Sequence, residues 1–559
     1  MKKNIDQVKI HCLNNNAKKK YEIGTSLKEI LADQKLKGNS RYFGALVNNK
    51  IKELSFQVFK PKDILFINIE HPDGVRMYVR SLSFVLLKAV KELFPPEARL
   101  RIDHSISNGL YCEIENIDKE LTFDRVFEIQ TRMRKIIEKD LIFTREEVRT
   151  NEAIKLFEEN NFPEKALLFK TRVKLYTSVY KLADQVGYFY GYLVPSTGYL
   201  KVFDLVKYYD GMLLRIPKKE RPSEVEDIII QNKLFEIFRE HKNWVRVLDT
   251  PSIGSLNQKI KTRKIGELIK ISEALHEKKV ARIADSIATR RKHIKLVLIS
   301  GPSSSGKTTF SKRLGIQLKV AGLKPFHISL DDYFVDREKN PVDENGKYDF
   351  ESLKALDVKL FNKNLIDLFA GKKVSLPKFS FETGKRYYDG TEIQVDQDHI
   401  IIVEGIHGLN PKLTPMIDDA TKFRIYVSAL TQISIDEDNR IPTTDNRLLR
   451  RIIRDHNYRN YTAAETIERW PSVRKGEEKN IFPYQEEADV MFNSALLYEL
   501  SVLKMYAEPL LHEIQENQHV YSEADRLLKF LSYFLPVADH EVPPTSIIRE
   551  FVGQSSFYY

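Results

Sequence analysis

The residue run with the most definite chemistry reads Gly-Pro-Ser-Ser-Ser-Gly-Lys-Thr-Thr and spans residues 301–309. It fits the phosphate-loop pattern G-x-x-x-x-G-K-[ST], in which backbone N–H groups at the start of a helix surround phosphate oxygens. In this pattern Lys307 brings a mobile positive charge to the β- and γ-phosphates, and Thr308 offers a hydroxyl to Mg²⁺. The run therefore predicts a nucleoside triphosphate site. The expected nucleotide-binding residues are Gly301, Ser303, Ser304, Ser305, Gly306, Lys307, Thr308 and Thr309.

The flanking residues supply the structural context that a phosphate loop needs. Residues 294–300 are mostly apolar and β-branched, which is typical of a buried strand. After the loop, Phe310, Leu314 and Leu318 recur at every fourth position, which predicts one face of a helix that ends near Gly322. A chance glycine- and serine-rich turn is the alternative, and these flanks argue against it.

Acidic residues follow two further expected strands. Asp331 follows residues 325–330, and Glu404 follows residues 399–403. In a parallel sheet these strand ends lie on the nucleotide side. A carboxylate there can accept the proton of an attacking hydroxyl and help to hold Mg²⁺, although a turn or helix-cap aspartate is the alternative. The expected metal ligands are Thr308, Asp331 and Glu404.

An arginine-rich segment, residues 445–459, is the third chemical feature. On a helix Arg447 would lie over Arg451, and Arg450 over Arg454. Like charges at this spacing repel, so the segment is expected to bind an anion as a lid over a transferring phosphoryl group. A solvated basic helix is the alternative. The expected catalytic residues are Asp331, Lys307, Arg451, Arg454 and Arg459.

Composition limits the class of protein. The chain has 559 residues, of which 42% are hydrophobic and 30% charged, and its net charge of +11 favours polyanionic partners such as nucleotides, phosphates or RNA. Two cysteines cannot form a disulfide framework, which favours a reducing cytoplasm. The polar start lacks the apolar core of a signal peptide, and no apolar run is long enough for a membrane span, so we expect no membrane partner.

The chain is too long for one core, and its patterns predict a multidomain α/β protein. The expected units are a small mixed α/β module over 1–70, an α+β domain over 71–225, a helical connector over 226–292, a parallel α/β domain over 293–500, and a helical extension with a tail over 501–559.

The order of motifs in residues 293–495 resembles the uridine kinase and phosphoribulokinase family of phosphate-loop kinases. The strand-end Asp331, the Glu404-Gly-Ile run and the D-x-R-L-x-R-R lid that begins at Asp445 all recur in that family. The resemblance implies ATP- and Mg²⁺-dependent phosphorylation of a nucleoside 5′-hydroxyl, with Asp331 as the base, and a role in pyrimidine salvage. It implies acceptor contacts by Tyr333, Tyr348, Asp349, Phe379 and Arg386.

The expected acceptor pocket departs from that family. Uridine kinases have aspartate, histidine and tyrosine where this chain has Ser380, Gly384 and Phe379. Loss of hydrogen-bonding groups weakens the case for uracil specificity more than the case for phosphoryl transfer. Two alternatives therefore stay open: a kinase of another sugar or sugar phosphate, and an RNA-binding protein with an ATP-controlled switch.

The first 225 residues resemble the front of threonyl-tRNA synthetases, a β-grasp (TGS) module followed by an editing domain. The landmarks are residues 47–50, 107–111 and 191–198. Those editing domains carry an H-x-x-x-H pair where this chain has Arg80 to Phe84, so we expect no editing chemistry. The remaining roles are a scaffold, a substrate or RNA surface, and a face for a homo-oligomer. The whole arrangement resembles the large bacterial nucleoside (uridine) kinases.

An aromatic run follows Val186 in the same region. Tyr188, Tyr190 and Tyr192 would share one side of a strand, where core or interface packing is favoured over stacking on a base.

Overall fold

The computed structural model describes residues 7–36, 41–218, 221–342, 346, 348–380, 382–396 and 398–558. The chain begins with a five-stranded sheet in the order β2-β1-β5-β3-β4, in which β1 and β5 are parallel and the other pairs antiparallel. Ser26 caps the helix α1 by accepting a hydrogen bond from the Glu29 N–H, while the Glu29 side chain bonds back to Ser26. The elements are β1 (Gln7–Cys12), β2 (Ala17–Glu22), α1 (Leu27–Gln34), β3 (Gly44–Val47), β4 (Lys50–Glu53) and β5 (Lys62–Ile67).

Two antiparallel sheets and the long helix α2 form the next unit. The sheets have the orders β10-β9-β8 and β11-β12-β7-β6. Helix α2 is buried along most of its second half, so it forms the centre of this unit. The elements are α2 (Pro72–Leu93), β6 (Arg99–Ile106), β7 (Gly109–Glu115), α3 (Phe123–Glu138), β8 (Phe143–Arg149), α4 (Thr150–Glu159), α5 (Pro163–Thr171), β9 (Tyr176–Leu182), β10 (Gln185–Gly187), η1 (Thr197–Tyr199), β11 (Asp204–Tyr208) and β12 (Gly211–Arg215).

The prediction that three tyrosines share one side of a strand is wrong. Strand β10 ends at Gly187, so the tyrosines lie in an irregular segment that follows it. Tyr188 is 4% exposed, and its hydroxyl contacts that of Tyr533. Tyr190 packs under the Arg80 guanidinium, 4.6 Å from ring centroid to Cζ. Both rings therefore serve packing.

Three helices lead from this unit to a parallel sheet. They are α6 (Asn232–Val247), α7 (Ile253–Lys261) and α8 (Ile265–Thr289). All three lie within residues 226–292, where a helical connector was expected, and α8 packs against α9, the helix that follows the phosphate loop.

The parallel sheet has the order β14-β19-β13-β20-β21, and all four neighbouring pairs are parallel. Strand β13, which precedes the phosphate loop, lies at its centre with all five residues buried. Helix α9 packs against β13, β14 and β19 through Phe310, Leu314 and Leu318, the stripe that the sequence predicted. This sheet with its flanking helices, preceded by β-rich units, confirms the predicted fold class.

The elements of this region are β13 (Leu296–Ser300), α9 (Lys307–Val320), β14 (Lys324–Ser329), η2 (Leu330–Tyr333), η3 (Arg337–Lys339), η4 (Leu353–Ala355), α10 (Val358–Phe369), β15 (Val374–Ser375), β16 (Lys378–Ser380), β17 (Lys385–Tyr387), β18 (Glu392–Ile393), β19 (His399–Glu404), η5 (Pro411–Leu413), η6 (Asp419–Thr421), β20 (Lys422–Ser428), α11 (Thr443–Arg459), α12 (Ala463–Asn480), η7 (Phe482–Glu487) and β21 (Val490–Asn493).

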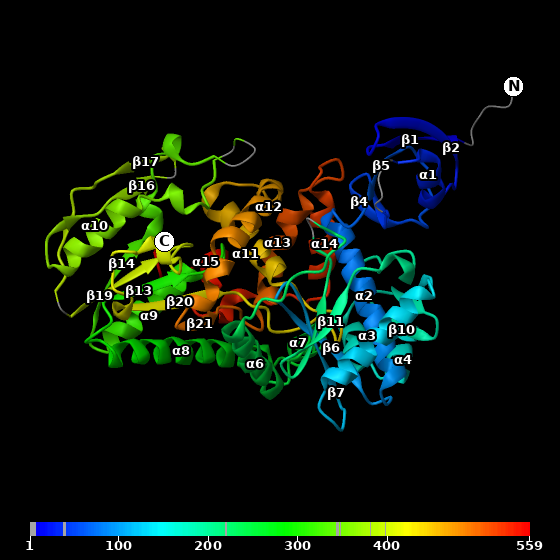
Figure 1. Ribbon diagram of the computed structural model, residues 1–559, viewed down its shortest axis with the longest axis horizontal. Helices are drawn as coiled ribbons and strands as arrows, with labels where there is room; N and C mark the ends of the chain where they lie inside the picture. Colours follow the sequence, from blue (N-terminus) through cyan, green and yellow to red (C-terminus); the bar gives the residue numbers. More distant parts are fainter. Residues whose placement is uncertain are drawn as a thin grey trace.

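The last part of the chain comprises α13 (Glu499–His512), α14 (Tyr521–Leu531), η8 (Asp539–Glu541) and α15 (Arg549–Val552). Figure 1 shows α11 to α14, coloured orange to red, between the parallel sheet and the blue helix α2. One continuous hydrophobic cluster joins residues of α2, α11, α13 and α14. The chain then returns to the parallel sheet, where α15 packs against α11. Within the described residues, no helix combines the length and apolar character needed to cross a membrane.

Candidate active site

The loop between β13 and α9 turns tightly at positions with unusual backbone angles. Ser304 has a φ of 58° and Gly306 a φ of 82°. A Cβ atom at Gly301 would lie 1.9 Å from the carbonyl oxygen of Val427 on β20, so only glycine fits there. The loop thereby leads into the first turn of α9, whose N–H groups have no partner inside the helix. These groups form an anion-binding cradle.

Lys307 opens α9 and lies against the loop. Its Nζ donates hydrogen bonds to the carbonyl oxygens of Gly301 at 2.9 Å and Pro302 at 3.1 Å. Burial lowers its pKa, and the carboxylates of Glu404 and Asp331 are among the groups that oppose this shift. The ammonium group is thus the positive centre of an acidic site.

Glu404 lies beside the loop because β19 is the neighbour of β13. It is in register with Ile299 of β13 and Ser329 of β14. Its Oε1 accepts a hydrogen bond from the Thr308 hydroxyl at 3.3 Å. Desolvation raises the pKa of Glu404 to about 7, although the Lys307 charge opposes the shift. Because desolvation disfavours the charged form of Glu404, any additional cation nearby would stabilise that charged form.

Asp331 follows β14, the strand on the other side of β19. Its side chain is solvent-accessible, yet the surrounding protein desolvates the carboxylate and raises its pKa. The positive charges of Lys307 and Arg459 oppose that shift. Its neighbour Asp332 is directed elsewhere, since its Oδ1 accepts a hydrogen bond from the Phe379 N–H at 3.4 Å. Asp331 is therefore the aspartate that shares the environment of Lys307.

Three oxygen donors in this site fit a divalent cation that also binds phosphate. They are the Thr308 hydroxyl and the carboxylates of Glu404 and Asp331, which influence one another electrostatically. No group of three or more His, Cys, Asp or Glu side chains in the described part of the chain could hold a metal ion. A cation here would take its other ligands from phosphate oxygens and water, which is the usual behaviour of Mg²⁺.

Three arginines of α11 converge around one carboxylate. Asp455 is 2% exposed and contacts Arg451 Nε at 3.1 Å, Arg454 Nη2 at 2.7 Å and Arg459 Nη1 at 3.7 Å. Arg451 also donates a hydrogen bond from Nη1 to the Ser303 hydroxyl of the phosphate loop at 2.7 Å. The helix thus holds an excess of positive charge directly beside the loop.

The other two arginines of that predicted cluster do not belong to it. Arg447 and Arg450 are buried and form ion pairs with Glu477 and Glu499, respectively. The expectation that like charges on this helix leave all of these arginines in need of an anion is wrong for these two. Burying a guanidinium requires a charged partner, and the protein supplies one for each.

Two of the residues expected to contact an acceptor are held by the fold. Tyr333 is 1% exposed, and its hydroxyl accepts a hydrogen bond from Asn364 Nδ2 at 3.1 Å. Arg386 pairs with Asp357 at 3.0 Å and donates to the Phe334 carbonyl at 3.1 Å. The structure therefore gives Tyr333 a core position and Arg386 a bracing role on the turn after Asp331, in contrast to the sequence-based expectation.

The other three residues expected to contact an acceptor are Tyr348, Asp349 and Phe379. Tyr348 is 45% exposed, and its ring lies 5.9 Å from that of Phe350. Asp349 accepts a hydrogen bond from the Glu351 N–H at 3.2 Å. The Phe379 ring packs 5.6 Å from that of Phe334. Of these, Tyr348 offers the most accessible surface.

Three carboxylates at the site were missed in the sequence. Glu477 of α12 accepts a hydrogen bond from the Ser303 N–H at 3.0 Å, and Glu550 of α15 accepts one from the Thr309 N–H at 3.2 Å. Desolvation, with a contribution from Glu477, raises the pKa of Glu351 to about 7. Glu351 follows two residues after Asp349 of the predicted Tyr348-Asp349 pair, and this proximity could have pointed to it. Glu477 and Glu550 lie in segments without any motif.

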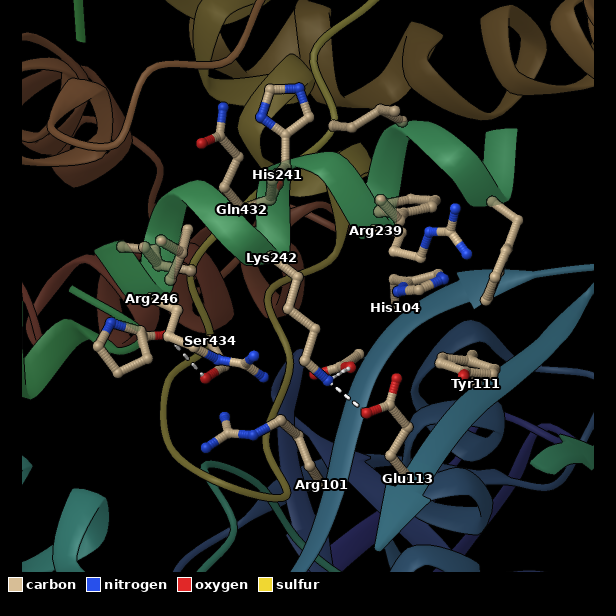
Figure 2. Close-up of a pocket in the computed structure, with 18 of the residues that line it drawn as sticks. Arg101, His104, Tyr111, Glu113, Arg239, His241, Lys242, Arg246, Gln432 and Ser434 are labelled. Carbon is tan, nitrogen blue, oxygen red and sulfur yellow. Dashed lines mark hydrogen bonds and ion pairs between the residues drawn. The ribbon is translucent and has the colours of Figure 1, made fainter. Parts of the chain in front are cut away.

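A separate cavity of about 280 Å³ lies away from these residues. Figure 2 shows it between β6, β7 and α6, with Lys242 reaching from the helix toward Glu113. Lys242 Nζ lies 2.8 Å from Asp103 and 2.5 Å from Glu113, so opposite charges within the wall are already paired. None of the residues predicted for the nucleotide, metal or acceptor lines this cavity.

The position of the missing H-x-x-x-H pair is filled by a large side chain. Arg80 of α2 donates a hydrogen bond to the Tyr192 carbonyl at 3.5 Å and stacks on Tyr190. A Cβ atom at Gly191 would come within 2.2 Å of its guanidinium. The side chain thus occupies the space between α2 and the aromatic segment.

Comparison with known proteins finds different relatives for the first and second halves of the chain. Residues 296–499 match the family model described as the phosphoribulokinase / uridine kinase family. The matched part is the one that contains the phosphate loop and the parallel sheet. Among solved structures, similarity is found to a possible uridine kinase from Bacillus stearothermophilus, with 20% identity, a TM-score of 0.25 and coverage of 36% of this chain and 89% of that one. A D-glycerate 3-kinase from Cryptococcus neoformans shares 14% identity, with a TM-score of 0.21 and coverage of 46% and 87%.

Curated relatives include threonine–tRNA ligases. That of Clostridium kluyveri is 30% identical over 257 residues, which cover 43% of this chain and 39% of the ligase. That of Acetivibrio thermocellus is 31% identical over 196 residues, covering 35% and 30%. The chain thus spans less than two fifths of the length of these relatives. A region similar to threonyl-tRNA synthetases thus precedes the part that matches the phosphoribulokinase / uridine kinase model, as the sequence indicated.

Proposed function

We propose that the protein transfers the γ-phosphoryl group of ATP to the 5′-hydroxyl of a nucleoside of the uridine or cytidine type. The observation that carries the proposal is the meeting of Lys307, Asp331 and Glu404 at one edge of the sheet, inside a domain of the phosphoribulokinase / uridine kinase family. In such kinases the protein forms no covalent intermediate, and positioning and electrostatics supply most of the acceleration.

Each residue then has a defined task. Lys307 leaves the loop carbonyls and binds the β- and γ-phosphates, while the first-turn amides of α9 hold the phosphate chain. Asp331 accepts the proton of the attacking hydroxyl, and desolvation makes it a better base than a solvated aspartate. Thr308, Asp331 and Glu404 would hold a divalent cation, Mg²⁺, which when bound neutralises phosphate charge.

The arginines of α11 stabilise the charge on the transferring group. Arg451 already touches Ser303, so a small rotation brings its guanidinium to a phosphate oxygen. Arg454 and Arg459 share Asp455 and retain donors for the same purpose. The buried Arg447 and Arg450 hold the helix in position.

The test compares two adjacent aspartates. We expect Asp331→Asn to lower turnover by about 10²- to 10⁴-fold, because it removes the proton acceptor. ATP affinity should change little, because Lys307, the amides of α9 and the other cation ligands are retained. Asp332→Asn is the matched control, and its effect is expected to stay within a few-fold because Asp332 bonds to Phe379. ATP-dependent phosphorylation of uridine is followed by product analysis. Equal losses in the two variants would remove Asp331 from its role.

A sugar or sugar phosphate is the alternative acceptor, because the family model covers sugar-phosphate kinases as well as nucleoside kinases. Ser380 and Gly384, where uridine kinases carry polar recognition groups, favour keeping it open. A panel of nucleosides, ribose and sugar phosphates with labelled ATP separates the two classes. Phosphorylation of a sugar phosphate alone would replace the nucleoside with that acceptor.

For the first 225 residues we propose a TGS-like module and an editing-like domain without hydrolytic activity. Arg80 fills the space where the editing family has its histidine pair, which supports this assignment. RNA is the partner suggested by the names of the curated relatives. RNA affinity that falls steeply with salt, without phosphorylation of any small molecule, would favour the RNA-binding alternative over the kinase.

A further inference from the structure

The C-terminal segment, residues 543–553, enters the nucleotide site. The Glu550 Oε2 atom accepts hydrogen bonds from the Thr309 N–H at 3.2 Å and from the Thr309 hydroxyl at 2.6 Å. The helical bonds of α9 begin with the Phe310 N–H, which donates to the Gly306 carbonyl, and the preceding N–H, that of Thr309, donates to Glu550. A carboxylate from a segment 241 residues away therefore sits where this helix binds anions.

Glu550 also faces the other charges of the site. Burial lowers the pKa of Lys307, and Glu550 is among the carboxylates that oppose this shift. Desolvation raises the pKa of Glu404, and Glu550 adds to that rise. The three groups are thus close enough to interact. A bound triphosphate would bring several further negative charges to the same place.

We propose that Glu550 occupies the position of a nucleotide phosphate in the empty protein, so that ATP binds only when this carboxylate turns away. This inference rests on the proposed function, because it requires ATP at the phosphate loop. The carboxylate and the phosphate compete for one amide. Occupancy by Glu550 for nine tenths of the time would weaken the apparent ATP affinity about tenfold.

The movement is confined to the side chain. Ile547 and Phe551 flank Glu550, are fully buried and belong to the core under α9. Ile547 closes over the phosphate loop, where its Cγ2 lies 2.5 Å from a Cβ built on Gly306. Release of the whole segment would expose these two apolar side chains to water, and exposing either one would lower the population of the released form about tenfold or more. Glu550 is only half-buried and can rotate alone.

Further contacts hold the same segment in place. The Ser546 hydroxyl donates to Glu273 of α8 at 2.5 Å, and the Phe551 carbonyl accepts from Asn457 of α11 at 3.1 Å. The Arg450 guanidinium lies 5.0 Å from the centroid of the Phe551 ring. The segment is therefore a fixed wall of the site with one mobile acidic group.

The experiment measures nucleotide binding without turnover. ATP is titrated into the full-length protein with EDTA present and no acceptor, using calorimetry. We expect Glu550→Gln, which retains shape and one acceptor oxygen, to bind ATP about tenfold more tightly than the unmodified chain, and Glu550→Ala at least as tightly. The control is Glu541→Gln, an exposed glutamate before the segment that lies 3.9 Å from Lys270 and is expected to leave affinity unchanged.

Two results would overturn the inference. The first is equal or weaker ATP binding by both Glu550 variants, or no ATP binding by any of the proteins. The second is ATP-induced protease cleavage within residues 543–553 of the unmodified chain, since that requires release of the whole segment. Failure of the proposed acceptor chemistry would appear separately, as tighter ATP binding in the variants without phosphorylation of any acceptor.

Discussion

Lys165 offers the sharpest test of how the two halves of the protein are joined. Its side chain on α5 is fully buried, and Nζ lies 2.9 Å from Asp436 and 3.5 Å from Glu437 and also contacts Asp438. These three acidic residues belong to the segment between β20 and α11, in the half of the chain that contains the phosphate loop. We predict that Lys165→Met strongly destabilises the protein, because it leaves three buried carboxylates without their cation.

Breaking a buried pair in this way costs about 3–5 kcal/mol. In a cooperative unit of 150–250 residues, this corresponds to a fall in melting temperature of roughly 6–20 °C. The matched control is Lys170→Met on the same helix. Lys170 is 52% exposed and pairs with Glu158 at the surface, where such pairs contribute about 0–1 kcal/mol. Calorimetric melting of the three proteins measures the difference.

The loss depends on pH with a defined sign. Desolvation raises the pKa of Glu437 to about 7 and that of Asp438 well above its ordinary value, with Lys165 opposing both shifts. A raised folded-state pKa means that protonation favours the folded state, so stability falls as pH rises from about 4.5 through 7. Without Lys165 this fall is steeper. The deficit of Lys165→Met should therefore be larger at pH 8 than at pH 5, and an equal or reversed dependence would refute the argument.

Two further predictions concern the phosphate loop. Gly301→Ala should abolish ATP binding measured by calorimetry, because its Cβ would lie 1.9 Å from the Val427 carbonyl oxygen; retained affinity would contradict the loop geometry. Arg451→Ala should lower turnover about 10²- to 10³-fold with the melting temperature nearly unchanged. Arg447→Ala should also lower the melting temperature, because it removes one of the two arginines, Arg447 and Arg474, that pair with the buried Glu477. Similar melting temperatures for the two arginine variants would contradict this division.

Local patterns predicted the elements that carry the site. The loop of residues 301–309 lies between a buried strand and an amphipathic helix, and Asp331 and Glu404 follow the neighbouring strands. These features depend on short-range sequence: glycine where backbone space is limited, apolar runs in buried strands, and apolar residues at every fourth position of a helix. The roles assigned to the individual residues stay predictions.

Burial was harder to predict from the same patterns. Tyr333 and Arg447 have residue types that suit an active site, yet each is held inside the fold by a specific partner, Asn364 and Glu477 respectively. Sequence spacing showed which side of α11 each arginine occupies. It did not show that α12 brings a carboxylate to one of these sides, because this depends on how the two helices pack.

By itself, the sequence determined the parallel sheet, its central phosphate loop and the acidic strand ends, since each is encoded within a few neighbouring residues. Only the tertiary structure decided that Glu477 and Glu550 reach the amides of Ser303 and Thr309, across separations of 174 and 241 residues. The physical reason is that such contacts arise when distant segments bury their apolar side chains in one core. Ile547 and Phe551 do so here, and Glu550 is carried to the loop between them.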